Sequence, residues 1–169
     1  MPGSAPSSPP RVAAVIVAAG RGLRAGGPTP KQYARVAGRT VLARSVEAMA
    51  AAAERVQLVI GPGDEDACSA ALVRLSEQSR QRLASPVTGG DTRQASVLAG
   101  LMALEPFAPD IVLVHDAARP FATRALVDRV VAAAGVGGAA IPGIPVVDTV
   151  KQVDGESRIT GTPDRATLR

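Results

Sequence analysis

The stretch VAAVIVAAGRGLRAGGPTPKQY spans Val12 to Tyr33 and passes from an apolar run directly into a loop rich in glycine and arginine. A short apolar run bounded by turn residues is typical of a strand buried in a parallel sheet. In such sheets, ligands bind beyond the carboxyl ends of the strands, where the chain turns toward a helix. The stretch therefore predicts an α/β fold whose first loop holds a ligand.

The residues of this first loop suit a polyphosphate. Ala18, Ala19 and Gly20 carry little or no side chain, so the backbone there can come close to a nucleotide. Arg24 and Lys31 follow in the same loop and supply two cations. Small residues combined with cations predict a site for phosphate groups.

A formal match to the dinucleotide-binding pattern G-x-G-x-x-A occurs at Gly20, Gly22 and Ala25. That pattern requires a helix at its third small residue and an acidic residue about 20 positions further on, at the end of the second strand. Pro28 and its neighbours forbid such a helix, and the next apolar run ends at Ile60 without an acidic residue. The sequence therefore favours a triphosphate, with a merely flexible glycine loop as an alternative.

Composition narrows the class of partner. The chain has 169 residues, the size of one domain, and its single Tyr, two Phe and no Trp leave little aromatic surface for stacking nucleic-acid bases. The net charge of +4 is spread along the chain, which favours a small phosphate-bearing ligand over nucleic acid. No apolar run reaches the roughly 20 residues that cross a bilayer, so we expect no membrane partner. Cys68 is the only cysteine, which fits a reducing cytoplasm, and we expect it to be inert.

Short apolar runs alternate with alanine-rich segments of helical period along most of the chain. This alternation is typical of a Rossmann-like α/β fold, a mostly parallel sheet flanked by helices. The predicted strands cover 12–18, 56–60, 83–88, 111–114 and 138–141, and the predicted helices cover 40–53, 65–78, 94–104 and 123–134.

We expect three regions along the chain. Residues 1–10 predict a disordered tail, and residues 11–141 predict a nucleotide-binding α/β domain. Residues 142–169 alternate apolar and polar side chains around a turn at Asp154-Gly155, and they predict a protruding β-arm that must pack on the body or on a partner chain. The sequence stops at Arg169 without a closing strand or helix, so we expect the C-terminal remainder of the domain to be missing.

A second loop, GGDTRQASVLAGL, covers Gly89 to Leu101 and leads into a predicted helix. Gly90 and Asp91 can lie against a base or a ribose, and Ser96 can donate a hydrogen bond from the first helical turn. The alternative is that Asp91 or Thr92 only caps the helix, and capping can coexist with binding.

A third loop follows the apolar run of VLVHDAARPF, which ends at Asp116. A carboxylate just past a buried strand is well placed to hold a magnesium ion that bridges phosphates, because hard oxygen ligands suit that ion. Arg119 can support this carboxylate or bind a phosphate. His115 is the only histidine, and without a G-x-S-x-G motif we expect it to be structural.

These three loops, together with PVVDTVKQV and TPDRATL in the arm, resemble the 2-C-methyl-D-erythritol 4-phosphate cytidylyltransferase family. The resemblance covers essentially all of the chain from Val12 to Arg169. It implies a nucleotidyltransferase fold and an enzyme that joins CTP to methylerythritol 4-phosphate, releasing pyrophosphate, in the non-mevalonate route to isoprenoids.

The resemblance also implies roles for individual residues. Arg24 and Lys31 would be catalytic, Asp116 would position a magnesium ion, and Arg119 would face the substrate phosphate. The cytosine and ribose would be held by six residues of the first two loops: Ala18, Ala19, Gly20, Gly90, Asp91 and Ser96. Thr149 and Arg165 of the arm match positions that reach a neighbouring subunit's active site, which implies a homodimer.

Three other functions remain open from sequence. A ribitol 5-phosphate cytidylyltransferase differs mainly in the polyol. A dinucleotide-dependent oxidoreductase is disfavoured because the sequence lacks the acidic residue that would bind the ribose. A non-catalytic, truncated nucleotide-binding module is suggested only by the end at Arg169, since the family continues further, and this leaves the activity of the 169 residues alone in question.

Overall fold

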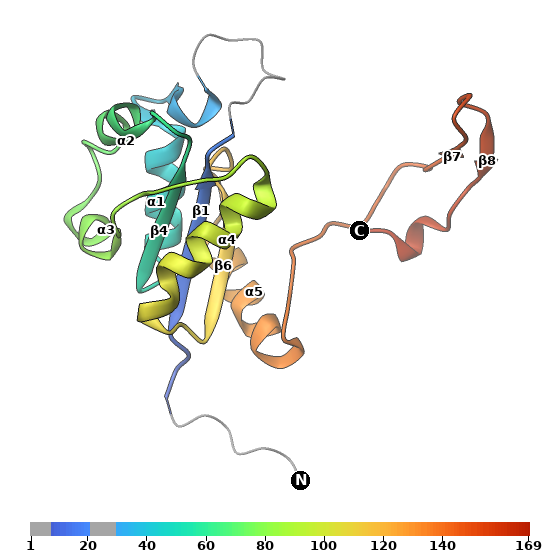
Figure 1. Cartoon of the computed structure of the whole chain (residues 1–169). Helices are drawn as coiled ribbons and strands as arrows, with labels where there is room; N and C mark the ends of the chain where they lie inside the picture. The colour runs from blue at the N-terminus through green and yellow to red at the C-terminus, as the bar shows by residue number, and fades with distance from the viewer. Residues whose placement is uncertain (1–7, 21–29) are drawn as a thin grey trace.

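Four parallel strands form the central sheet of the protein, whose computed structural model describes residues 8–20 and 30–169 (Figure 1). β1 (Val12–Ala18) lies in the interior between β4 (Arg55–Ile60) and β6 (Ile111–Asp116). β5 (Val87–Thr88) extends the sheet beyond β4. All three pairings are parallel, which confirms the predicted α/β fold class.

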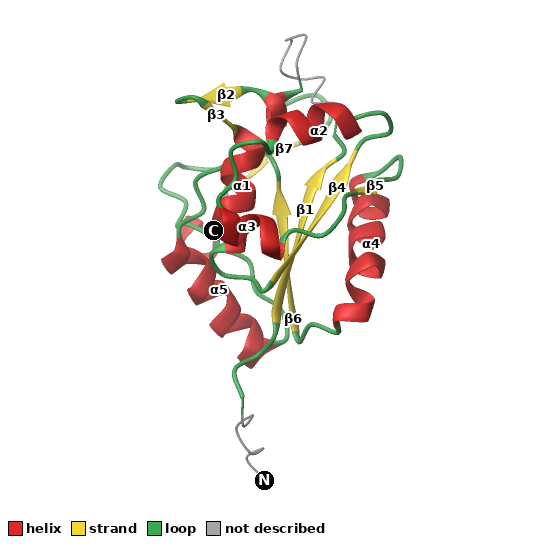
Figure 2. Cartoon of the chain, turned by 90° about the vertical axis from the view of Figure 1, so that its left-hand side faces the viewer, coloured by secondary structure: helices red, strands yellow, loops and turns green. Residues whose placement is uncertain are grey.

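Helices cover both faces of this sheet, as Figure 2 shows. One face carries α1 (Val41–Ala50), α2 (Glu65–Ala71), α3 (Glu77–Arg82) and α5 (Arg124–Gly137), and the other carries α4 (Arg93–Leu104). Alternate side chains of β1 point to opposite faces of the sheet. Ile16 belongs to the larger apolar cluster with α1, and Val15 belongs to the smaller cluster under α4. A strand with two covered faces needs an apolar run without alternation, which is the pattern in the sequence.

Helix α4 lies unusually close to the sheet because of a glycine. A Cβ atom at Gly100 would lie 2.5 Å from Cγ1 of Val15 and 2.9 Å from Cγ2 of Val59. Only a residue without a side chain fits there, so this glycine sets the distance between α4 and the strands.

Side-chain caps decide where most of the helices begin. Thr40, Ser76, Thr92 and Thr123 each accept a hydrogen bond from the backbone N–H three residues further on, at the starts of α1, α3, α4 and α5. Such caps satisfy one of the N–H groups that a helix leaves unpaired at its N-terminus.

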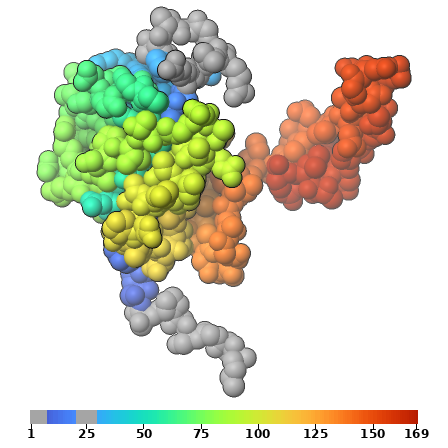
Figure 3. Space-filling view, in the orientation of Figure 1, coloured from blue at the N-terminus to red at the C-terminus, as the bar shows by residue number. Residues whose placement is uncertain are grey.

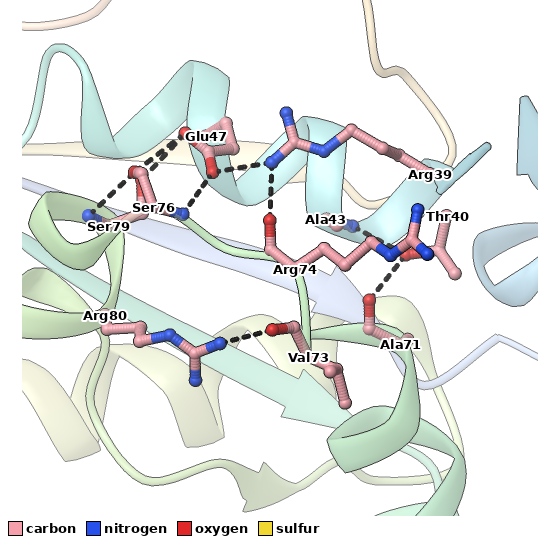
Figure 4. A network of polar contacts seen from close by, with 10 residues as sticks. All are labelled: Arg39, Thr40, Ala43, Glu47, Ala71, Val73, Arg74, Ser76, Ser79 and Arg80. Atoms are coloured by element: carbon pink, nitrogen blue, oxygen red, sulfur yellow. Dashed lines mark hydrogen bonds and ion pairs between the residues drawn. The ribbon is translucent and has the colours of Figure 1, made fainter. Parts of the chain in front are cut away.

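A polar network around Glu47 joins α1 to the segment that connects α2 and α3 (Figure 4). The Glu47 carboxylate accepts hydrogen bonds from the backbone N–H of Ser76 (2.8 Å), from the hydroxyls of Ser76 (3.1 Å) and Ser79 (3.0 Å), and from Arg39 (3.0 Å). Burial by itself raises the pKa of Glu47, but these hydrogen bonds and the Arg39 charge outweigh it and hold the pKa below its ordinary value.

The remaining elements are short. They are η2 (Lys31–Tyr33), the antiparallel pair β2 (Arg35–Val36) and β3 (Arg39–Thr40), η3 (Glu105–Phe107), the antiparallel pair β7 (Gln152–Val153) and β8 (Ile159–Gly161), and η4 (Arg165–Thr167). In the parts of the chain that the model describes, no helix has the length and apolar character needed to cross a membrane.

Three predicted elements differ from the structure. The strand predicted over 83–88 is reduced to β5 (Val87–Thr88) and an isolated bridge between Leu83 and Val56. The helix predicted over 65–78 is divided into α2 and α3, because Leu72 leaves the helical path and Ser76 starts a new cap. The strand predicted over 138–141 does not form: Gly138 ends α5 in the left-handed conformation, with φ +78°, and the segment then runs exposed. No described strand pairs with these residues, so the apolar character of the segment alone was misleading.

Residues 142–169, which we call the arm, extend away from the rest of the molecule (Figures 1 and 3). The β7–β8 pair forms its hairpin, and Oδ1 of Asp154 accepts hydrogen bonds from the N–H groups of Glu156 and Arg158 to close the turn. This hairpin was predicted from the alternating pattern. The division of the chain into a tail, a domain and an arm stays a prediction, and most of the predicted tail lies outside the described residues.

Candidate active site

The predicted site residues of the body follow β1, β5 and β6, whose carboxyl ends lie at one edge of the sheet because the strands are parallel. We call the described loops at this edge the loop edge: residues 18–20, 30–33, 88–92 and 116–119. The topology thus gathers three loops that are spread over about a hundred residues of the chain, at the position where α/β proteins bind ligands.

The first loop is held by Gln32, a residue that the sequence analysis did not single out. Its side chain is only 5% exposed, and Nε2 donates hydrogen bonds to the backbone oxygens of Ala18 (2.7 Å) and Gly20 (3.1 Å). Its neighbour Lys31 is exposed on the same turn of η2. The burial of Gln32 could not be predicted from residue type, because a glutamine beside a lysine in a loop is ordinarily exposed.

Tyr33 fastens the end of η2 to the start of α2. Its hydroxyl donates a hydrogen bond of 3.2 Å to Oδ2 of Asp64. Burial, followed by the negative charge of Asp64, raises the pKa of Tyr33, so that the phenol stays protonated as a donor. Lys31 is therefore placed on a short turn whose next two residues, Gln32 and Tyr33, are anchored to other segments. Arg24, the other predicted catalytic residue, lies outside the described residues.

The second loop packs directly against the first. A Cβ atom at Gly89 would lie 2.6 Å from Oγ of Ser96 and 2.7 Å from Cβ of Ala19. The Gly89 N–H also donates a hydrogen bond of 2.8 Å to the backbone oxygen of Ile60. Close approach of the two loops therefore requires glycine at this position.

Ser96 and Asp91 have different surroundings. Ser96 is 2% exposed, and its hydroxyl donates a hydrogen bond of 3.3 Å to the backbone oxygen of Gly90. Asp91 is exposed, and Thr92 rather than Asp91 caps α4. The structure thus leaves the Asp91 carboxylate free of the capping role that was its alternative interpretation.

Asp116 lies between two arginines at the end of β6. Its Oδ1 accepts hydrogen bonds from Nε (3.1 Å) and Nη2 (2.9 Å) of Arg93, and its Oδ2 accepts one from Nε of Arg119 (3.1 Å). Burial raises the pKa of Asp116, but the hydrogen bonds and charges of Arg93 and Arg119 outweigh it and hold the pKa below its ordinary value. Asp116 is therefore ionised at neutral pH, as a metal ligand must be.

Asp116 can bind a magnesium ion only if substrate phosphates and water supply the other ligands of the ion. Among the described residues, no group of three or more His, Cys, Asp and Glu side chains comes together. Magnesium commonly takes one or two carboxylates and completes its coordination with water and substrate phosphates. Asp116 alone could hold it in that way.

His115 and Cys68 are occupied in structural roles. Nε2 of His115 forms a hydrogen bond of 3.0 Å with the backbone oxygen of Arg119, and burial lowers the pKa of His115. Cys68 is 1% exposed, and burial raises its pKa to about 11, which disfavours the reactive thiolate. Both findings agree with the predictions.

The arm residues do not join the loop edge of their own chain. Thr149 and Arg165 lie in the arm, away from the body (Figure 3), and Nη1 of Arg165 donates a hydrogen bond of 2.9 Å to the backbone oxygen of Val147. In this structure the arm is organised on itself.

Comparison with known proteins agrees with this arrangement. Residues 12–169 match the model of a family described as "IspD: 2-C-methyl-D-erythritol 4-phosphate cytidylyltransferase". The chain belongs to this family. Its place in the cytidylyltransferase family confirms the resemblance seen in the sequence.

Similar proteins in this family are longer than the chain. A bifunctional enzyme IspD/IspF from Nitrobacter hamburgensis is 54% identical over 161 residues, which cover 94% of the chain and 38% of that protein. The solved 4-diphosphocytidyl-2C-methyl-D-erythritol synthase from Anaerococcus prevotii has a TM-score of 0.76 at 30% identity, covering 93% of the chain and 66% of that structure. The 2-C-methyl-D-erythritol 4-phosphate cytidylyltransferase from Thermus thermophilus has a TM-score of 0.63 at 34% identity, covering 92% and 64%.

Proposed function

We propose that the chain provides the nucleotide-binding part of a cytidylyltransferase that forms 4-diphosphocytidyl-2-C-methyl-D-erythritol and pyrophosphate from CTP and 2-C-methyl-D-erythritol 4-phosphate. The observation that carries this proposal is the loop edge itself, which gathers a small-residue loop, a glycine loop and an ionised carboxylate flanked by arginines at the carboxyl edge of one sheet. Family membership supports the same assignment.

The base and ribose would be bound by the first two loops. Ala18, Ala19 and Gly20 offer backbone groups without side-chain obstruction, and Gly90 and Asp91 offer a small residue and an exposed carboxylate on the facing loop. Ser96 would act from beneath, where its hydrogen bond to the Gly90 oxygen sets the course of the second loop. Preformed contacts of this kind reduce the ordering cost of binding.

The reaction would be a direct displacement. A phosphate oxygen of methylerythritol phosphate attacks the α-phosphorus of CTP, the bond to the bridging oxygen breaks, and pyrophosphate leaves with its electron pair. Such transfers depend on alignment and on cations directed at the charge that develops on phosphate oxygens. Lys31 and Arg24 would supply these cations, and Arg119 would hold the phosphate of the second substrate. A magnesium ion held at Asp116 would neutralise charge on the triphosphate.

We further propose that the enzyme works as a homodimer, with Thr149 and Arg165 of one arm completing the site of the partner subunit. The support is that both residues belong to the arm, which extends away from the body of its own chain (Figure 3). A cytoplasmic location also stays a prediction, based on the lone Cys68.

The proposal can be tested with an activity assay of the full-length protein. Pyrophosphate release should be measured with CTP and magnesium in the presence of either methylerythritol 4-phosphate or ribitol 5-phosphate. Release with the first and not with the second supports the proposal. Release with ribitol 5-phosphate only would reassign the polyol, and NAD binding without CTP binding in calorimetry would contradict the assignment altogether.

A further inference from the structure

Both carboxylate oxygens of Asp116 accept hydrogen bonds from arginines, and Oδ1 accepts two. Two N–H groups of Arg93 occupy Oδ1 at 3.1 and 2.9 Å, and Nε of Arg119 occupies Oδ2 at 3.1 Å. A magnesium ion binds a carboxylate oxygen at about 2.0–2.1 Å and carries its own ligands. A cation of this kind cannot reach Oδ1 while the Arg93 guanidinium covers it, so the ion and the arginine compete for this oxygen.

Arg93 is well placed to leave Asp116. Its side chain is 61% exposed, and in the described part of the chain Asp116 is its only hydrogen-bond partner. It is the first residue of α4 and follows the second loop directly. The guanidinium therefore lies between the loop proposed to bind the nucleotide and the carboxylate proposed to bind the metal.

Arg119 is bound differently. It belongs to the same turn as Asp116, and it reaches Oδ2 through Nε alone. Its backbone oxygen is also engaged by His115. Of the two arginines, Arg93 is thus the one that comes from another element and blocks one carboxylate oxygen with two donors.

We infer that Arg93 exchanges partners during nucleotide binding: it covers Asp116 in the free protein and passes to a phosphate of the triphosphate when the metal arrives. An exposed ion pair of this kind contributes little net stability, so the exchange is not costly. A divalent cation repels the guanidinium, and a phosphate group accepts it in the same two-pronged geometry as a carboxylate.

The exchange has two consequences of opposite sign. Without nucleotide, Arg93 opposes metal binding at Asp116. With nucleotide, Arg93 strengthens binding of the triphosphate. Metal and triphosphate therefore bind cooperatively, and the cation is held only when its substrate is present. The inference rests on the proposed function, since it takes the loop edge as the triphosphate site.

The test measures two affinities in the full-length protein and in four variants. Manganese, as a paramagnetic probe for the divalent cation, is titrated without nucleotide and followed by electron paramagnetic resonance, and CTP with magnesium is titrated by calorimetry. Arg93→Ala should bind manganese several-fold more tightly, because the competing exposed ion pair is weak, and should bind CTP about tenfold more weakly, the size of one charge-assisted contact. Arg93→Lys should lie between. Arg55→Ala removes an equal charge at the opposite end of β4 and should match the wild type.

Asp116→Asn separates failure of the inference from failure of the proposed function. If it leaves manganese binding in the presence of CTP unchanged, the metal role of Asp116 is wrong, and the exchange falls with it. If it weakens that binding while Arg93→Ala shifts both affinities in one direction or shifts neither, the exchange alone is wrong. Opposite shifts in Arg93→Ala support it, because a merely structural role moves both affinities together.

Discussion

At the loop edge, hydrogen bonds and close contacts join segments that are far apart in the chain, whereas the arm makes its hydrogen bonds within itself. Gln32 holds the first loop through two hydrogen bonds, and Gly89 holds the second loop against it through a contact that admits no side chain. In the arm, by contrast, no residue from 142 to 169 is buried, and Ile144, Val147 and Ile159 are 80%, 78% and 65% exposed. The difference indicates that the loops of the body are already organised around one site, while the arm presents apolar surface that suits a partner.

The largest expected effect tests whether the arm acts on a second subunit. Lys31→Ala and Arg165→Ala should each lower turnover of the full-length protein by roughly a hundredfold or more, because each removes a cation from the reacting phosphates. Mixed in equal amounts and allowed to exchange subunits, the two inactive variants should regain about a quarter of wild-type turnover, since a twofold dimer then holds one intact site in every mixed pair. Melting temperatures measured by circular dichroism should be unchanged.

The same mixture can also contradict the shared site. If the arm acts within its own chain, no combination of the two variants assembles an intact site, and the mixture stays inactive. Near-normal turnover of Lys31→Ala alone would remove its catalytic role.

The next prediction compares the stability that one isoleucine contributes in the body with the stability that one contributes in the arm. Ile16 is 0% exposed in β1, and its truncation in Ile16→Ala should lower the free energy of unfolding by about 2–5 kcal/mol. Ile159→Ala in the arm should change it by less than about 0.5 kcal/mol. Urea unfolding monitored by circular dichroism at low protein concentration measures both. An equal loss in the two variants would mean that the arm packs on the body in solution.

One glycine in each region allows a second comparison, with a smaller expected effect on stability. Gly89→Ala forces a Cβ atom into contact with Ser96 and Ala19 and should cost roughly 1–3 kcal/mol of stability, together with weaker CTP binding. Gly155→Ala, in the turn of the arm, meets nothing within 4 Å and should leave both unchanged. Thermal unfolding and calorimetric titration with CTP report the two quantities. A stable Gly89→Ala protein with normal CTP affinity would show that the loops can separate.

The smallest effect concerns pH. The pKa of Glu47 lies below its ordinary value in the folded protein, so the stability that this residue contributes is present above its unfolded-state pKa and is lost as the pH falls through the lower, folded-state pKa. Wild type should therefore exceed Glu47→Gln in the free energy of unfolding by roughly 1 kcal/mol at pH 7, and this advantage should be smaller at pH 3, below the ordinary pKa of a glutamate. Urea titrations at both values check the sign. An advantage that grows at low pH would contradict it.

Much of the fold was readable from local patterns. The unbroken apolar run 12–18 predicted a doubly covered strand, and the strand at 111–116 and the helices after Thr40, Thr92 and Thr123 were predicted close to their actual positions. The strand predicted at 138–141 was wrong, because apolar character does not supply a pairing partner. Among the site residues, the sequence suggested Asp116 as a metal ligand, but it did not indicate that Arg93 covers it.

By itself, the sequence determined the α/β class, the three loops and the family, because these depend on residue type and order along the chain. Only the tertiary structure decided how the loops meet. The burial of Gln32 beneath the first loop, the contact of Gly89 with Ala19, and the pairing of Arg93 with Asp116 each join residues from different segments. Such contacts depend on distances between folded elements, and no spacing along a chain encodes them directly.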